Sequence, residues 1–152
     1  MTKKNKDRGR DKVNRLNKEK MKAVEKLVKY WIDLAKHDFK TMEGLFRLKR
    51  YPDALFYGHM VLEKILKAIV VKNKKKHPQP THNLLVLLEE ASISLTKAEK
   101  EFLAEVNKFN IRARYPDYKL SFYKIANLKY TRKRLERIKL LCKKLWQEIK
   151  KS

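Results

Sequence analysis

The sequence predicts an all-α fold, an antiparallel up-and-down bundle of about five helices. Apolar residues recur every three or four positions along most of the 152 residues, which places them on one face of successive helices. Only three glycines and four prolines occur, too few for many hairpin turns. Hydrophobic residues make up 43% of the chain, so one domain of this length can bury a core.

The first 45 residues are predicted to combine a basic arm with a long helix. Residues 1–20 hold hardly any apolar residue, so we expect a disordered or loosely helical arm. This arm would contact RNA or an acidic partner, or would serve only as a solubilising tail. The bundle is expected over residues 21–152, because an apolar stripe begins at Met21 and predicts an amphipathic helix as far as Leu45.

Residues 51–74 are predicted to form the central helix. Apolar residues surround this segment on nearly every side, so the helix should be buried on nearly every side. His59, Glu63 and Lys67 nevertheless fall at i, i+4 and i+8 within it. We therefore expect a row of polar side chains inside the core.

Shorter helices complete the predicted bundle. One follows a proline-containing loop and covers residues 82–91. Thr96 and Glu99 form a capping box that begins the next helix, which a following proline should end near Arg114. The last helix is expected from about Leu128.

The charge of the chain predicts a polyanionic partner. The net charge is +23 and the isoelectric point is near 10.1, so the surface should attract nucleic acid, acidic protein or anionic lipid. Lysine far outnumbers arginine, and lysine binds phosphate without reading bases. Any nucleic-acid binding should therefore depend on salt and show little sequence specificity.

Other classes of function have little support in the sequence. The four histidines lack metal-ligand spacing, and no glycine-rich phosphate loop occurs, so we expect no metal and no cofactor. The single cysteine, Cys142, excludes an internal disulfide and fits a buried thiol. No signal-like or membrane-spanning run is present, and we expect a cytoplasmic protein that does not bind membranes.

Four polar residues are candidates for one cluster in the core. We expect Glu63 and Arg114 to lie close together with Asp38 nearby, and His59 to join them across the first two helices. A carboxylate among apolar residues must take up a proton or find a cation, and the fork of an arginine can supply two hydrogen bonds. Such a cluster is either an ion-pair network that fixes helix register or an anion-binding pocket.

The chain resembles the HEPN (higher eukaryotes and prokaryotes nucleotide-binding) domain family over about residues 21–150. The order and spacing of several short pieces carry the resemblance. They are Trp31 with Asp38 and Phe39, RYPDA at 50–54, LEKILKA at 62–68, THNL at 81–84 and ARYPD at 113–117. The resemblance implies an all-α up-and-down bundle, which the periodicity predicts independently.

The resemblance also divides the possible functions. Many HEPN proteins are metal-independent ribonucleases in which a histidine follows an arginine after four to six residues, but no histidine follows His82 here. The RYPD form is similar to members that accompany a minimal nucleotidyltransferase. This implies a homodimeric nucleotide- or RNA-binding module without catalytic residues, in a toxin–antitoxin-like pair, with Arg112, Arg114, Tyr115, Asp117 and His82 as candidate binding residues. The alternatives are a divergent ribonuclease toxin and a basic RNA-binding bundle.

Overall fold

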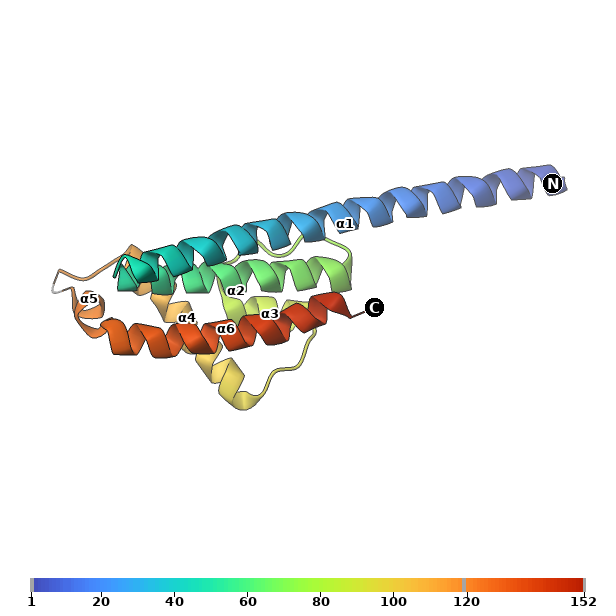
Figure 1. The fold of residues 1–152 in the computed structure, drawn as a ribbon. Helices are drawn as coiled ribbons and strands as arrows, with labels where there is room; N and C mark the ends of the chain where they lie inside the picture. The colour runs from blue at the N-terminus through green and yellow to red at the C-terminus, as the bar shows by residue number, and fades with distance from the viewer. Residues whose placement is uncertain (1, 119, 152) are drawn as a thin grey trace.

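A computed structural model describes residues 2–118 and 120–151 and shows a helical bundle (Figure 1). The described residues form six α-helices and no strand, so the predicted all-α bundle is confirmed. The helices are α1 (Lys3–Arg47), α2 (Tyr51–Lys74), α3 (Leu84–Ala91), α4 (Lys97–Arg114), α5 (Ser121–Ile125) and α6 (Leu128–Lys150).

Helix α2 lies at the centre of the bundle and contacts all five other helices. Figure 1 shows α1 and α6 running alongside it, with α3 and α4 behind. Most α2 side chains are buried, as its apolar composition predicts. The core is therefore built around one helix, and the polar residues of α2 lie inside it.

Gly58 allows α6 to approach α2 closely. A Cβ atom at this position would lie 2.6 Å from Cδ1 of Ile138 and 3.6 Å from Sδ of Met42. Ile138 is fully buried, so its methyl group has little room to move. The glycine is thus explained by packing between α1, α2 and α6.

Helix α1 does not begin at Met21 but continues back to Lys3. Residues 2–20 are all exposed, and Figure 1 shows this part of α1 projecting beyond the end of the bundle. Propensity explains the continuation, because lysine, arginine and glutamate favour helix and no proline interrupts the segment. The segment is helical without packing on the bundle.

Capping residues fix the ends of the later helices. The predicted capping box of Thr96 and Glu99 is present at the start of α4. Asn83 and Asn127 accept backbone N–H bonds at the starts of α3 and α6. The short helix α5 lies between the predicted end near Arg114 and the predicted last helix, and it was not predicted. Its five residues are too few to show helical periodicity.

Two further predictions concern membrane-spanning helices and the thiol of Cys142. Among the described residues, no helix is long and apolar enough to cross a membrane. Cys142 is buried, as expected, and burial raises the pKa of its thiol to about 12. At neutral pH the thiol is therefore protonated and unreactive.

Candidate functional site

The RYPD segment at residues 114–117 begins at the last residue of α4 and lies at the end of the bundle that also holds α5 and the turn from α1 to α2 (Figure 1). Two arginines stand in the last turn of α4. Cζ of Arg112 lies 4.8 Å from the ring centroid of Phe122, and Cζ of Arg114 lies 5.6 Å from that of Phe56. Cation–π contacts thus hold both guanidinium groups near the surface.

A small pocket lies beside Arg112. It has a volume of about 110 Å³ and is lined by Arg112, Tyr115, Asp117, Ser121 and Phe122. Ligand pockets for whole drug-sized molecules are typically about 300–1,000 Å³. This pocket therefore has room for a group the size of a phosphate, while a base or sugar would lie outside it.

Asp117 is held by the first residue of α5. Its Oδ1 accepts from the backbone N–H of Ser121 at 2.8 Å, and its Oδ2 accepts from the Ser121 hydroxyl at 2.7 Å. These bonds, with a smaller contribution from Arg112, lower the pKa of Asp117. The carboxylate is ionised at neutral pH and is bonded to the first residue of α5.

The predicted pairing of Glu63 with Arg114 is wrong. Glu63 is only 2% exposed, and its two oxygens lie 2.7 Å from Nδ1 of His82 and 3.3 Å from Nζ of Lys67. Arg114 instead lies over Phe56, seven positions earlier on α2 and roughly 10 Å away along the axis. The i, i+4 spacing brings Lys67 to Glu63, so no arginine is needed.

Buried lysines explain this difference. The side chain of Lys67 is buried, as the polar row predicted, and that of Lys64 is largely buried. Asp38 pairs with Lys64, with 2.5 Å between Oδ2 and Nζ, so Asp38 is not part of the Glu63 cluster. Nζ of Lys67 also lies 5.0 Å from the Trp31 ring centroid. Helix α1 therefore supplies an anion for one lysine and an aromatic ring for the other.

His59 fastens the segment before α3 to the core. Its Nε2 lies 2.8 Å from the carbonyl oxygen of His82, and its Nδ1 lies 3.2 Å from Nδ2 of Asn110. These partners fit a neutral ring that donates from Nε2 and accepts at Nδ1. Burial lowers the pKa of His59, although the nearby Glu63 opposes this effect. His59 thus has a structural role, linking α2 to α4 and to the loop.

Two asparagines in α4 complete this network and were not predicted. Besides Asn110, Asn107 accepts from the backbone N–H of Leu84 at 2.9 Å and donates to Asn83 at 3.0 Å. Their signal in the sequence is weak, since an asparagine near an apolar helix stripe is usually solvated. These two asparagines can be recognised as part of the network only in the structure, where α4 packs against the THNL segment.

The structure groups four of the five candidate binding residues. Arg112, Arg114, Tyr115 and Asp117 share the end of α4, and Tyr115 is 71% exposed. His82 belongs instead with Glu63, yet its side chain is 57% exposed. No group of three or more metal-ligating side chains occurs among residues 2–118 and 120–151. The arrangement presents the Arg112 guanidinium, the Tyr115 ring and the Asp117 carboxylate around a phosphate-sized pocket, while Arg114 lies over Phe56 outside the pocket lining.

Comparison with known proteins gives one match. The family model of the HEPN domain matches residues 28–152, which include every helix of the bundle but omit the projecting part of α1. Neither the search of curated proteins nor the search of solved structures found a match.

Proposed function

Because the chain belongs to the HEPN family, we propose that it binds a nucleotide or RNA at the RYPD end and has no catalytic activity of its own. One observation carries this proposal. Arg112, Tyr115 and Asp117 surround a pocket that accepts a phosphate-sized group, and Arg114 stands on the same helix end. The shape fits a ligand that inserts a phosphate and leaves its base outside.

Each residue has a separate role in this binding mode. The Arg112 guanidinium bonds to phosphate oxygens, and Arg114 adds positive charge to the same helix end from outside the pocket. The exposed Tyr115 ring offers a face on which a base stacks. Asp117 repels phosphate but has acceptor capacity beyond its bonds to Ser121, which suits a ribose hydroxyl.

The same geometry argues against chemistry at this end. Metal-independent RNA cleavage needs a group that takes up and releases a proton near the scissile phosphate. Arginine side chains have no acceptor atom for a proton, and the lowered pKa of Asp117 makes it a weak base. The ribonuclease motif also needs a histidine after its arginine, and the sequence contains no histidine after His82.

Exposed apolar residues at this end support assembly with other chains. Aromatic and aliphatic side chains are enriched at interfaces, and contiguous exposed patches mark them. Those at the end of α4, the following loop, α5 and the start of α6 are Ile111, Tyr115, Tyr118, Leu120, Tyr123, Ile125 and Leu128. We place a homodimer contact here and, beside it, a minimal nucleotidyltransferase partner in a cytoplasmic toxin–antitoxin-like pair. Light scattering that gives a monomer at every concentration would contradict the dimer.

An RNA titration tests the binding. The double variant Arg112→Ala, Arg114→Ala should bind a fluorescent single-stranded RNA at least tenfold more weakly than the unchanged protein. A matched variant, Lys143→Ala, Lys150→Ala, removes the same charge from exposed positions of α6 and should bind almost normally. If the two variants lose RNA affinity equally, the binding depends only on total charge and the RYPD end is not a specific site.

A divergent ribonuclease is the second candidate, because one histidine is arranged as a general acid or base. Nδ1 of His82 lies 2.7 Å from the buried Glu63 carboxylate while the side chain remains 57% exposed. A carboxylate in this position orients an imidazole for proton transfer. Metal-free cleavage of RNA that disappears in His82→Asn would establish this function. Intact RNA after long incubation with pure protein would exclude it for that substrate.

A further inference from the structure

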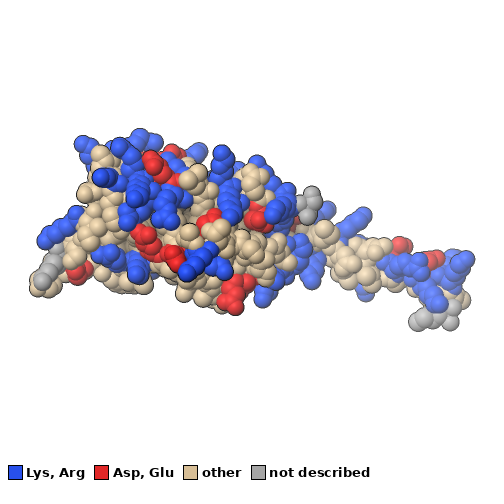
Figure 2. Space-filling view, turned by 90° about the horizontal axis from the view of Figure 1, so that it is seen from below, with Lys and Arg blue, Asp and Glu red and all other residues tan. Residues whose placement is uncertain are grey.

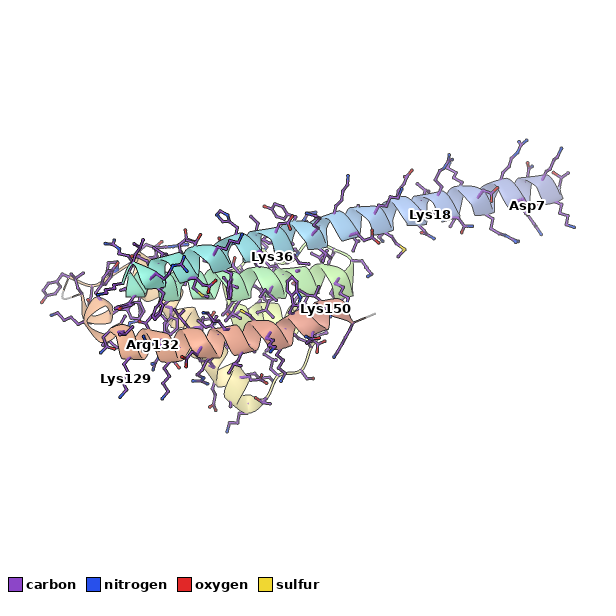
Figure 3. All side chains as sticks on the ribbon, viewed as in Figure 1. Asp7, Lys18, Lys36, Lys129, Arg132 and Lys150 are labelled. Atoms are coloured by element: carbon purple, nitrogen blue, oxygen red, sulfur yellow. The ribbon has the colours of Figure 1, made fainter. Side chains whose placement is uncertain are left out.

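The projecting part of α1, residues 3–20, is the largest feature that the proposed function leaves unused. We call it the arm helix. Its 18 residues span roughly 27 Å, and Figure 3 shows Asp7 and Lys18 on it well beyond the other helices. All its side chains are exposed, and it lies outside the matched HEPN domain. A helix without packing on its own bundle presents every face to a partner.

The arm helix has one face without acids. It carries nine lysines and arginines against three acids. Steps of three and four residues define the face that continues the buried side of α1. Its members are Lys3, Lys6, Arg10, Val13, Asn17 and Lys20, and we call it the acid-free face. Asp7, Asp11 and Glu19 all lie on the other sides of the helix.

The acid-free face leads into a basic groove at the end of the bundle. A cavity of about 450 Å³ lies between α1 and the C-terminal end of α2. Lys20 of the arm helix lines it together with Lys26, Lys75 and Lys76, over an apolar floor that includes Leu27. None of the described residues lining this groove is acidic. One positive tract therefore runs from the tip of the arm helix to the end of α2.

We propose that the arm helix and this groove bind the phosphate backbone of double-helical RNA. Charge complementarity is the first reason, because a duplex has a high density of phosphate charge along its axis and the arm helix is straight and basic. Figure 2 shows positive side chains spread over one face of the bundle and along the projecting helix. The lysines on the acid-free face act as point charges, which suits backbone contacts without base reading.

The composition of the arm helix distinguishes a duplex from other polyanions. Residues 3–20 contain no Phe, Trp or Tyr, so single-stranded bases find no ring on which to stack. Val13 is the only apolar member of the acid-free face, so a protein helix would bury little apolar surface along it. The regular outer shape of duplex RNA needs neither feature. This site is separate from the RYPD end, which lies at the opposite end of α2.

Two charge-matched variants of the full chain test the proposal. The first changes the acid-free face by Lys3→Gln, Lys6→Gln, Arg10→Gln and Lys20→Gln. The control changes the other sides by Lys4→Gln, Arg8→Gln, Arg15→Gln and Lys18→Gln. Both lose four positive charges, and glutamine keeps the helix propensity, which circular dichroism checks. The probe is a blunt RNA duplex of about 20 base pairs, somewhat longer than double-stranded-RNA domains typically span.

The first variant should bind the duplex at least tenfold more weakly than the control at about 0.1 M salt. The slope of log affinity against log salt should become shallower by roughly 3 to 4, since about 0.9 counterions are released for each phosphate contact. The control should keep most of the affinity and the slope. Equal losses in the two variants would overturn the proposal. So would a loss of single-stranded RNA binding in the first variant as large as its loss of duplex binding, or tighter binding of a poly-glutamate peptide of equal charge.

Loss of RYPD binding is distinguishable from loss of this site. The Arg112→Ala, Arg114→Ala variant should retain duplex binding, because its arm helix is unchanged. If this variant loses the duplex while the acid-free-face variant keeps it, the arm helix is not the site. If the acid-free-face variant loses the duplex and keeps single-stranded RNA, the two sites are independent, as proposed.

Discussion

Breaking the Glu63–Lys67 pair should destabilise the bundle strongly. Both side chains are almost fully buried, and 3.3 Å separates Oε2 of Glu63 from Nζ of Lys67. Removing one partner of a buried pair typically costs about 3–5 kcal/mol, because the other charge stays buried. For a domain of this size, 1 kcal/mol shifts the melting temperature by about 2–4 °C. Lys67→Met should therefore lower the melting temperature by roughly 6–20 °C.

A double-mutant cycle separates this pair from its neighbours. Glu63→Gln and Lys67→Met should each lower the free energy of unfolding in urea, and the double variant should lose clearly less than the sum of the two. Arg114→Ala serves as the control partner for Glu63→Gln. Arg114 lies over Phe56 and not beside Glu63, so those two effects should add.

The opposite pattern would refute this pairing. If Glu63→Gln and Lys67→Met add while Glu63→Gln and Arg114→Ala couple, Arg114 is the true partner of the carboxylate. His82→Asn gives an independent check, because Nδ1 of His82 contacts the other oxygen of Glu63. Because this side chain is partly solvated, its loss should cost less than the loss of Lys67.

Three further results are expected. In Gly58→Ala the new methyl group meets Ile138, which should lower the free energy of unfolding by about 1–3 kcal/mol, offset by up to about 1 kcal/mol from better helix propensity. Gly44→Ala is the control: the nearest atom to its new methyl group lies 3.9 Å away, so this variant should be neutral or stabilising in the same measurement. Deleting residues 2–20 should shift the melting temperature by no more than about 4 °C, since these side chains are exposed; a larger drop would show that the arm helix packs. The pKa of His59 is lowered in the fold, so the contribution of neutral His59 to stability is present above the unfolded pKa of about 6.5 and is lost as the pH falls below that value. Urea unfolding should therefore give a lower free energy of unfolding at pH 5 than at pH 7. His59→Gln should make the difference between the two pH values smaller.

The fold was predictable because its signals repeat along the chain. Apolar steps of three and four residues locate the long helices, and the capping box of Thr96 and Glu99 marks the start of α4. Helix α5 has no comparable repeat, and its start depends on Asp117 binding Ser121 across the loop. Helix α1 runs through the predicted boundary at residue 20, and Val24 is its first described residue that is not exposed.

The polar contacts were less predictable because they depend on three-dimensional neighbours. The sequence places a carboxylate at Glu63 inside the core and requires a cation for it. Spacing alone does not show whether Lys67 points to Glu63 or to solvent, since a lysine stem reaches either. The packing of Trp31 over Lys67 decides this, and it belongs to another helix. The RYPD residues are different, because they are adjacent in the sequence and share one helix end.

One NMR titration tests most directly whether the RYPD end binds RNA without cleaving it. A short single-stranded RNA added to ¹⁵N-labelled full-length protein should shift backbone signals of residues 112–118 and 121–123, which surround the pocket at Arg112. The recovered RNA should run uncut on a denaturing gel. Shifts confined to other parts of the bundle, or RNA cut without added metal, would contradict the proposed function.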